Sequence, residues 1–501
     1  MSLRERVDGL EISALRRRSL IRIIGALIGF ISLMMVPSLL VSLFYRDGNH
    51  LPFIESGLLL AVVGFALWWP VRHVRHELRI REGFLVVSVC WIVACFGGAL
   101  PLVLSPAPGL SFTDAMFETM SGLTTTGATV ISGLDQLPKG VLFHRQALCW
   151  LGGMGIVVLA IAILPLLRIG GTQLIKAESS GPMKDSKMTP RVAETAKSLW
   201  LIYAGLTAMC AAAYWLAGMS LFDAVGHAFS TLATAGFSTH DASYSHWNSL
   251  TIELIAIVFM IAGGINFGLH FLVWRNASFK PYYADIELRS FLSIALLASL
   301  LVTLCLWWVD GYQGDYSGFL TSLRAATFQV VSLMTTTGFV TADIGFWPPL
   351  AGMLLMIVGI VGACAGSTTG GIKVIRVIAL WQMLAREFKR LVHPKGHFVV
   401  ALDDNVVENR VLESIAVFFF AYVLSLLGIA ALIAATGVDI LTAGTAAIVT
   451  LGNVGPGLGG VSTSFAGFND FATWVCTLAM LLGRLELFTL LILLTPAFWR
   501  E

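Results

Sequence analysis

The sequence predicts an all-α polytopic membrane protein, with four helix–loop–helix repeats around one pseudo-fourfold axis and an additional N-terminal two-helix unit. Two observations lead to this fold class. Of the 501 residues, 57% are hydrophobic and only 12% are charged, whereas an average soluble domain is about 25% charged. Polar stretches that contain glycine also recur four times, each between apolar runs long enough to span a bilayer.

Ten apolar runs predict ten membrane-spanning helices, because each is near the length of about 20 residues that a spanning helix needs. The eighth run is short and ends in "GACAGSTTGG" before apolar sequence resumes, so we interpret residues 350–380 as one interrupted helix. The runs are 20–45, 55–70, 84–104, 141–167, 197–217, 249–274, 288–309, 350–365, 413–435 and 471–498.

The distribution of basic residues predicts that both termini are cytoplasmic. If the spans alternate from a cytoplasmic N-terminus, 27 Lys and Arg residues lie on the cytoplasmic side. Cytoplasmic loops of membrane proteins carry such an excess. Only four basic residues then lie outside: Arg46, Lys139, Arg145 and Arg324.

The polar stretches are copies of one unit, with repeat periods of 109, 102 and 117 residues. Each copy contains a spanning helix, an outer half-helix of about ten residues, a polar loop and a second spanning helix. Twenty-eight residues after the loop glycine, all four copies have glycine again, at Gly155, Gly264, Gly366 and Gly483. The loop glycines themselves are Gly127, Gly236, Gly338 and Gly455.

The repeated loops have the chemistry of a site for a monovalent cation. Irregular backbone at membrane depth is tolerated only where it is buried or lines a water-filled cavity. Rings of backbone carbonyls can replace the hydration shell of such a cation, and glycine allows the backbone angles that they require. The half-helices would also direct their negative C-terminal ends at the pore. Ordinary outer loops with turn glycines are the alternative, but they need not share one period.

The elements "TTTGA", "ATAGF", "TTTGF" and "NVGP" resemble the filter loops of the Trk/Ktr/HKT superfamily of cation transporters. "GACAGSTTGGIKVIR" at 362–376 and "GRLELFTLL" at 483–491 match further elements, so the resemblance covers nearly the whole chain. The N-terminal unit of about 75 residues looks like the Trk branch. The resemblance implies potassium uptake across the bacterial inner membrane, with potassium as the transported ion, no organic cofactor and no enzymatic activity.

The resemblance also implies partners and a division of the chain. The expected partners are a second copy in a homodimer, a TrkA-like cytoplasmic regulatory subunit that binds nucleotides, and the lipid bilayer, with no nucleic acid. The expected segments are an N-terminal two-helix unit (1–78), pore repeats one (79–195) and two (196–285), repeat three with an intramembrane loop (286–405), and repeat four (406–501).

Matching the loops position by position predicts the residues of the selectivity filter. The fourth loop departs from the threonine pattern, and only its glycine is shared. Within the superfamily a serine in place of the first glycine tends to accompany sodium preference, so Gly127 favours potassium. The predicted filter residues are Thr125, Thr126, Gly127, Thr234, Ala235, Gly236, Thr336, Thr337, Gly338, Asn453, Val454 and Gly455.

A second layer is predicted on the cytoplasmic side of the filter. The stretch at 362–371 interrupts the third repeat with small and hydroxylic residues, and in the family this intramembrane loop obstructs the pore. The alternative is a kink that only relieves packing. The predicted gate residues in the loop are Gly366, Ser367, Thr368, Thr369, Gly370 and Gly371.

Arg484 lies in an otherwise apolar helix, where a charge usually faces the bundle interior or a cavity. We predict that it forms an electrostatic barrier in the cation pathway. A structural ion pair with Glu486, or with another buried acid such as Glu118, is the alternative. Lys373 and Arg376, just after the loop, are interpreted as cytoplasmic anchors.

The remaining polar residues receive ordinary interpretations. Asp114 and Asp223 are expected to start half-helices. The histidines His144, His227 and His240 show no metal-ligand spacing and receive no role. The seven cysteines lie in apolar segments and are interpreted as packing residues.

Three alternative functions remain to be weighed. A sodium- or proton-coupled symporter of the same superfamily stays open. Secondary transporters of other classes often have inverted repeats and buried carboxylates, whereas these repeats share one orientation and membrane-embedded acids are few. An intramembrane enzyme is disfavoured, because the spans contain no paired catalytic carboxylates, Ser–His pair or HExxH motif.

Overall fold

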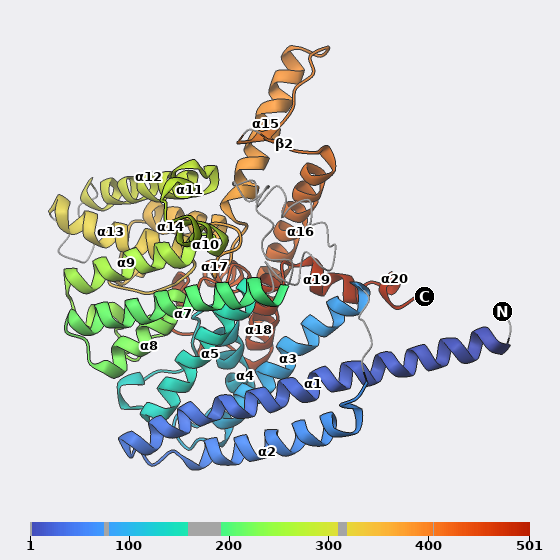
Figure 1. Ribbon diagram of the computed structural model, residues 1–501. Coiled ribbons are helices and arrows are strands. Elements are labelled where there is room, and N and C mark those ends of the chain that lie inside the picture. The colour runs from blue at the N-terminus through green and yellow to red at the C-terminus, as the bar shows by residue number, and fades with distance from the viewer. Residues whose placement is uncertain (1–2, 75–79, 159–191, 309–317, 404, 501) are drawn as a thin grey trace. The chain divides into compact units, whose positions relative to one another are not determined.

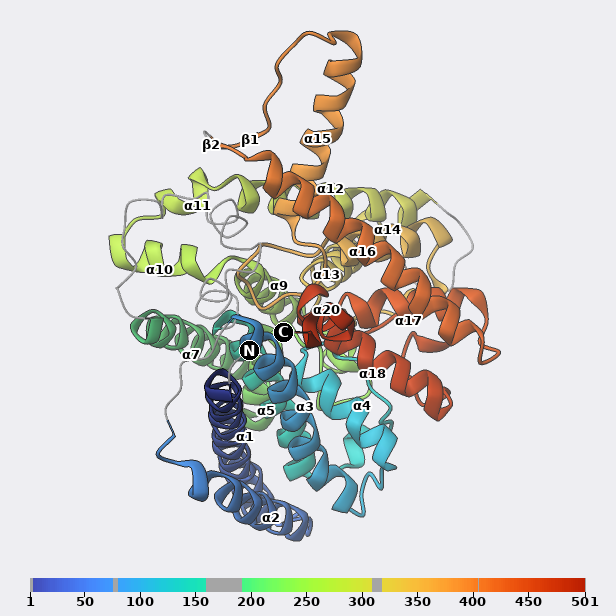
Figure 2. The same ribbon diagram turned by 90° about the vertical axis from the view of Figure 1, so that its right-hand side faces the viewer.

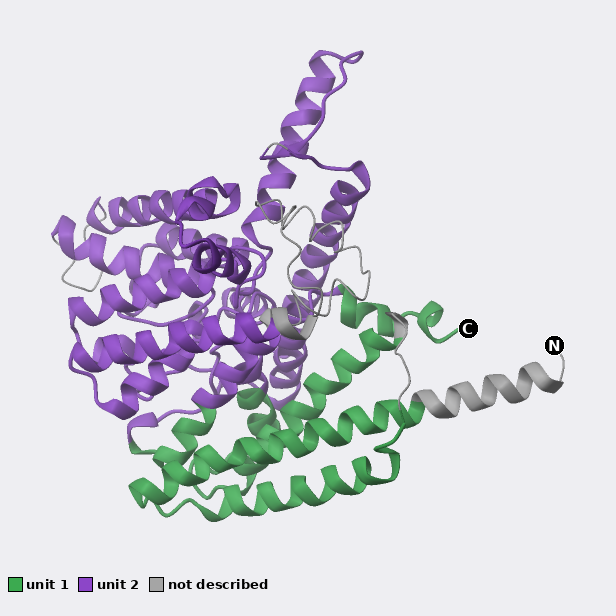
Figure 3. Ribbon diagram, in the orientation of Figure 1, with its two compact units in different colours: residues 1–119, 136–145, 488–501 green, residues 120–135, 146–487 purple. Residues whose placement is uncertain are grey.

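The computed structural model describes residues 3–74, 80–158, 192–308, 318–403 and 405–500. These residues are mostly helical (Figure 1), which confirms the predicted all-α fold. They form two compact units, which are coloured separately in Figure 3. Unit 1 comprises residues 1–119, 136–145 and 488–501, and unit 2 comprises residues 120–135 and 146–487. The five segments expected from the repeats remain a prediction.

Unit 1 is built on a closely packed helix pair, as the N-terminal two-helix prediction requires. A Cβ added to Gly25 would lie 2.8 Å from the Trp68 amide nitrogen, and one added to Gly64 would lie 2.7 Å from the Gly29 nitrogen. Small residues therefore bring the two backbones together, as is common between membrane helices. The helices of unit 1 are α1 (Leu3–Tyr45), α2 (Leu51–Trp68), η1 (Trp69–Val71), α3 (Ile80–Leu104), α19 (Phe488–Leu491), η8 (Ile492–Leu494) and α20 (Pro496–Trp499).

The chain passes between the units inside two helices, α4 (Phe112–Leu123) and α5 (Lys139–Val158), which are joined through η2 (Leu134–Gln136). Within unit 1, Arg145 and Glu118 form a fully buried ion pair, with Nη2 2.7 Å from Oε1. Breaking such a pair on one side is costly, because the remaining charge stays buried.

The predicted outer half-helices are α4, α8 (Leu221–Leu232), α13 (Phe319–Met334) and α17 (Ile440–Leu451). Three of them have 12 residues, close to expectation, and α13 is longer at 16 residues. Each ends four residues before the loop glycine of its repeat. The polar loop therefore starts at the same point in every repeat.

Three of the four half-helices begin at capping side chains, as predicted for α4 and α8, whereas α13 begins after Gly318 without a side-chain cap. Ser220 accepts a hydrogen bond from the Asp223 amide at 3.1 Å and donates its hydroxyl to the Asp223 carboxylate at 2.6 Å. Ser111 and Asp114 make the same pair of contacts at the start of α4. These reciprocal bonds satisfy the free amides of a helix start. Asp439 likewise caps α17.

The long helices confirm a polytopic protein, although not all ten spans as predicted. In the described residues, six helices are long and apolar enough to cross a membrane, or eight if two broken pairs each count as a span. The eighth predicted run is only the 13-residue α14 (Pro349–Val361), and the fourth extends from α5 into residues outside the described part. The long helices of unit 2 are α7 (Val192–Leu216), α12 (Ile286–Trp308) and α16 (Asn409–Ala434).

Two predicted spans are broken, which the apolar pattern did not reveal. Run 249–274 divides into α9 (Leu250–Gly264) and α10 (Phe267–Asn276), which meet at 95°. Asn266 causes this break, since its side chain caps α10 by accepting from the Gly268 amide at 2.7 Å. In run 471–498, α18 (Asp470–Arg484) ends where Glu486 and Leu487 take positive φ angles.

The third repeat is interrupted as predicted, between α14 and α15 (Val374–Val392). Figure 2 shows α15 extending outward from unit 2, after which the chain returns through a short antiparallel pair, β1 (Ala401–Leu402) and β2 (Asn405–Val406). The remaining short elements of unit 2 are α11 (Lys280–Ala284), η5 (Ser243–His246), η6 (Ile344–Phe346) and η7 (Gly459–Val461).

Candidate functional site

The four polar loops share one unusual backbone. Two residues before each loop glycine, the chain adopts the left-handed region, with φ between 51° and 53°. The glycines themselves have φ between 75° and 101°. The left-handed residues are Thr125, Thr234, Thr336 and Asn453. The repeat in sequence is therefore also a repeat in backbone conformation.

This conformation is unfavourable for three of the four residues. A β-branched residue with positive φ is a genuine outlier, whereas Asn adopts it more readily. Such strain costs on the order of 1–3 kcal/mol per residue and persists only where the surroundings impose it, often at functional sites. The departure of the fourth loop from threonine thus relieves strain without changing the backbone.

The loops close into a ring, and the glycines mark the contacts. A Cβ on Gly127 would collide with the carbonyl oxygen of Ala235, and one on Gly236 would collide with that of Thr337. Gly338 faces the Val454 carbonyl, and Gly455 faces the Thr126 carbonyl. The contacts therefore run from loop one to two, three, four and back to one. We call residues 124–128, 233–237, 335–339 and 452–456 the loop ring.

All twelve predicted filter residues lie in the loop ring, buried or half-buried. Each carbonyl that abuts a neighbouring glycine belongs to the residue just before its own loop glycine. At each loop glycine, the positive φ disfavours any side chain, and the neighbouring carbonyl leaves no room for a Cβ atom. The ring accordingly explains why the sequence keeps glycine at all four positions.

The side chains of the left-handed residues are not equivalent. Thr234 Oγ1 lies 3.1 Å from Thr368 Oγ1, and Thr336 Oγ1 accepts from the Gly370 amide at 2.8 Å. Asn453 Nδ2 instead donates to Thr126 Oγ1 at 3.0 Å, while Thr125 Oγ1 makes no hydrogen bond. The four left-handed residues therefore do not form a uniform ring of hydroxyls.

The predicted gate residues lie in the α14–α15 loop, residues 362–373. This loop packs against the side of the loop ring that the charge distribution predicts to face the cytoplasm. The Gly371 amide donates to the Gly452 carbonyl at 3.0 Å, and the Phe267 amide donates to the Gly366 carbonyl at 3.0 Å. Glu287 Oε1 accepts from the Ala365 amide at 2.7 Å. The loop is thus hydrogen-bonded to the fourth loop of the ring, to α10 and to α12, instead of forming a simple kink.

Thr368 is the most connected residue of this loop. Its hydroxyl lies 3.1 Å from the carbonyl oxygens of Leu232 and Gly263 as well as from Thr234 Oγ1. Its carbonyl accepts from Arg484 Nη1 at 2.8 Å. Thr368 therefore links the end of half-helix α8, the end of α9 and the buried arginine.

Arg484 is 2% exposed and is bound by carbonyl oxygens. Besides Thr368 it contacts the Gly152 carbonyl at 3.4 Å, and its Nε has no hydrogen-bond partner. The predicted ion-pair alternative is wrong for the described residues, because Glu118 pairs with Arg145 and Glu486 pairs with Arg376. A buried guanidinium without a carboxylate therefore lies beside the loop.

A comparison with known protein families agrees with the repeats and loops described above. The model of the family described as TrkH, a cation transport protein, matches residues 50–500. The chain belongs to the TrkH family of cation transport proteins. This confirms the superfamily resemblance and the expectation that the chain is not an enzyme.

Individual relatives agree with the family match. The Trk system potassium uptake protein TrkH of Salmonella typhimurium is 49% identical over 97% of this chain and 99% of that protein. TrkG of Escherichia coli is 37% identical over 95% of this chain and 97% of that protein. The crystal structure of the potassium transporter TrkH from Vibrio parahaemolyticus is similar with a TM-score of 0.89 and 46% identity, and covers 96% of this chain and 99% of that one.

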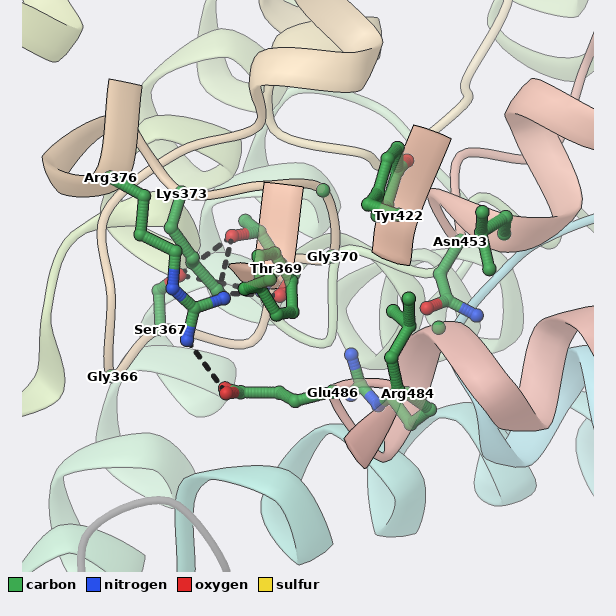
Figure 4. Close-up of a pocket in the computed structure, with 15 residues that line it drawn as sticks. Gly366, Ser367, Thr369, Gly370, Lys373, Arg376, Tyr422, Asn453, Arg484 and Glu486 are labelled. Atoms are coloured by element: carbon green, nitrogen blue, oxygen red, sulfur yellow. Dashed lines mark hydrogen bonds and ion pairs between the residues drawn. The ribbon is translucent and has the colours of Figure 1, made fainter. Parts of the chain in front are cut away.

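In this TrkH-family chain, Lys373 and Arg376 are not cytoplasmic anchors. Both are buried, and Lys373 Nζ donates to the Thr369 carbonyl at 2.7 Å. Arg376 Nη2 lies 2.7 Å from Glu486 Oε2, and its guanidinium lies over the Phe418 ring at 4.3 Å. Figure 4 shows the hydrogen bond from Lys373 to Thr369 and the ion pair of Arg376 with Glu486 as dashed lines. The count of basic residues along the chain assigned both residues to the cytoplasmic side of the membrane, but it gave no information about their burial.

A small cavity separates this group from the loop ring. Its volume is about 30 Å³, with Asn453 and Arg484 on one side and Lys373 and Ser367 on the other (Figure 4). That volume holds one or two water molecules, and its polar walls can bind them. Three cationic side chains, those of Lys373, Arg376 and Arg484, therefore line this space together with the carboxylate of Glu486.

The second set of repeated glycines in the TrkH-family chain does not form one layer. Gly155 is exposed, whereas Gly152 packs against the carbonyl of Leu123 at the end of α4. Gly483 packs in the same way against Leu451, at the end of α17. The glycine that allows a helix to approach its half-helix is therefore not at a constant distance from the loop glycine in every repeat.

A histidine cluster, which the sequence did not reveal, lies in segments that the charge distribution predicts to be outside the membrane. His240 Nδ1 contacts an oxygen of Asp135, and the His240 ring stacks on His246 with centroids 3.7 Å apart. Its Nε2 lies 3.5 Å from Asp223 Oδ1. The carboxylates of Asp223 and Asp135 raise the pKa of the His240 imidazole. The expectation that His240 is a lone histidine is therefore wrong.

Proposed function

We propose that this chain is the membrane subunit of a potassium-uptake system and conducts potassium through the loop ring. The observation that carries the proposal is the closed contact from each loop glycine to the carbonyl of the next loop. The relatives named above, which are called potassium uptake proteins, support the choice of ion.

The twelve ring residues named in the sequence analysis would supply the coordinating oxygens. Backbone carbonyls held in fixed positions can replace the water shell of a potassium ion. The ends of α8, α13 and α17 lie just before their loops, so their negative helix ends favour a cation. Because the loops carry no carboxylate, a divalent ion would gain less in this ring.

The α14–α15 loop would be the gate. Its bonds to Thr234, Thr336 and the Gly452 carbonyl hold it against the ring. Arg484 would act as an electrostatic barrier, since an unpaired guanidinium opposes the passage of a cation. Both elements would have to move before ions cross at full rate.

Regulation would reach this gate through α15. The helix begins at Val374, directly after the loop, and carries exposed basic and apolar residues such as Lys389 and Trp381. A TrkA-like nucleotide-binding subunit in the cytoplasm would bind there and pull on the loop. With the predicted orientation, both termini are cytoplasmic, and the chain works as a homodimer in the bacterial inner membrane.

The test is flux of rubidium, as a tracer for potassium, into liposomes that contain the purified chain. We expect uptake down a gradient without sodium or proton gradients, stronger inhibition by potassium than by sodium, and stimulation by the purified TrkA-like partner. Uptake that requires a sodium or proton gradient would instead establish the coupled symporter. No cation flux with or without the partner would refute the proposed function.

A further inference from the structure

The cluster of Asp135, His240 and His246 brings together three metal-ligating side chains from two repeats. One ligand atom from each lies within 4.8 Å of the others. Asp135 follows the first loop of the ring, and His240 lies only four residues after Gly236 of the second loop. We propose that these three residues bind a divalent transition-metal ion such as Zn²⁺ on the outer side of the loop ring, and that the bound ion slows cation passage.

The donor set fits this class of ion. Imidazole nitrogen and carboxylate oxygen are ligands of Zn²⁺ at about 2.0–2.2 Å, and sites with three protein ligands leave a position open for water. Asp135 and His246 are exposed, so their side chains can move inward by the small distance that coordination requires. The stacked His240 and His246 rings would tilt so that both point a lone pair at the ion.

The carboxylate of Asp223 faces the second ring nitrogen of His240, the central ligand of the cluster. Metal-binding histidines almost always direct their second ring nitrogen at a carboxylate, a carbonyl or water, which fixes the ring. His240 Nε2 faces Asp223 Oδ1 at 3.5 Å. Asp223 is itself held by the hydroxyls of Thr239 and Ser220 at 2.7 and 2.6 Å. The cluster therefore has a supporting layer and is more than a chance meeting of exposed side chains.

The position of the cluster explains why occupancy would affect flux. Between His240 and His246, the Tyr244 amide donates to the Val340 carbonyl at 3.0 Å, two residues after the loop glycine of repeat three. The Gly133 amide of repeat one donates to Asp241 at 3.0 Å. A metal ion here would tie three loops together and add positive charge outside the ring.

Binding is measured on the purified, metal-stripped full-length chain by calorimetric titration with ZnCl₂, and with MgCl₂ as a second arm. We expect one Zn²⁺ per chain and no comparable binding of Mg²⁺. His246→Ala and Asp135→Asn should weaken Zn²⁺ binding at least tenfold, and Asp223→Asn should weaken it by about 10- to 100-fold. His246→Cys should restore it, because thiolate is also a zinc ligand.

The matched control is His397→Ala, which removes an exposed histidine outside the cluster and should bind Zn²⁺ like the parent chain. Equal Zn²⁺ binding by the parent, His246→Ala and Asp135→Asn would overturn the site, as would equal binding of Mg²⁺. A thermal melt of each variant establishes that it is folded before titration.

The effect on transport rests on the proposed function, whereas the binding measurement does not. We expect micromolar external Zn²⁺ to lower rubidium uptake at least fivefold for the parent chain and for His397→Ala, but not for His246→Ala. Zn²⁺ bound at the cluster with unchanged uptake would overturn the effect on passage alone. Absence of uptake in every chain, with Zn²⁺ binding intact, would count against the proposed function and leave the metal site standing.

Discussion

The loop ring and the helices that follow it keep the repeat to very different degrees. All four loops have a left-handed residue at the same position, the same glycine and the same contact to the next loop. The helices after the loops end differently: α9 meets α10 at 95°, α14 gives way to a twelve-residue loop, and α18 stops at a buried arginine. The loop ring is therefore uniform, whereas the helix ends that follow it differ from repeat to repeat.

This difference separates two tasks. An ion in a ring needs equivalent oxygens from every side, so each repeat is held to the same backbone. Under the proposed function, control of passage would need only one movable element, and a single repeat would supply it in the α14–α15 loop. Because Thr234, Thr336 and the Gly452 carbonyl all bond to the α14–α15 loop, the ring is tied to the proposed gate on three sides.

The largest effect is expected from adding a methyl group to the ring. Gly236→Ala combines a positive φ with a collision at the Thr337 carbonyl. A penalty of about 3 kcal/mol corresponds to roughly a 100-fold loss of the intact ring. Rubidium uptake in liposomes should fall accordingly.

The matched control is Gly205→Ala in α7, where an added Cβ meets nothing within 4 Å. It should leave uptake unchanged and can raise stability by up to about 1 kcal/mol. If Gly236→Ala and Gly205→Ala transport equally well, the ring does not carry the ion.

The next effect concerns the buried arginine. Arg484→Ala removes a charge and the bond to the Thr368 carbonyl, and a bond to a charged group contributes about 1.5–3 kcal/mol. Cation leak without the partner should rise about 10- to 100-fold. Arg484→Lys keeps the charge but not the planar fork, so it should leak less than Arg484→Ala. Flux that stays at the parent level in Arg484→Ala removes the proposed barrier.

Loosening the loop without touching any charge should have a smaller effect. Thr368→Val keeps the shape of the side chain but removes its hydroxyl contacts to Leu232, Gly263 and Thr234. Unmet carbonyls cost about 1–3 kcal/mol, so leak should rise about five- to tenfold, with the preference for potassium over sodium unchanged. Thr321→Val, at an exposed helix start, is the control. A change in ion preference would show that the two layers are not separable.

The smallest effect is expected at the one irregular ring position. Asn453→Thr restores the threonine pattern but places a β-branched residue at φ 53° and removes the donor to Thr126 and to the Met480 carbonyl. The chain should lose about 1–2 kcal/mol of stability. A thermal melt should show a lower midpoint, while uptake stays within about twofold. A higher midpoint would contradict the assignment of Asn453 as a relief of strain.

The ring could be predicted from sequence because its requirements are local. A positive φ and a close carbonyl both demand glycine, so the need appears in the sequence at one position of every repeat. The interruption after Val361 was visible for the same reason, since small and hydroxylic residues replace an apolar run. Patterns of this kind need no knowledge of distant contacts.

What the sequence did not reveal depends on contacts between distant residues. Asp135 and His240 are 105 positions apart, and only the fold brings them together. Lys373 and Arg376 look like surface charges until Thr369 and Glu486 are placed beside them. The break at Asn266 is a single capping side chain inside an apolar run, which hydrophobicity alone cannot distinguish from a continuous helix.

The direction of the glycine contacts has a consequence for recombining the repeats. Each glycine abuts the carbonyl of one specific neighbour, in the order one, two, three, four, one. A transplanted hairpin must therefore suit two different partners, offering a glycine to one and a carbonyl to the other. Chimeric or circularly permuted chains that preserve this cyclic order should assemble. Exchanging two adjacent hairpins should keep only one of the four loop-to-loop contacts and mismatch the other three.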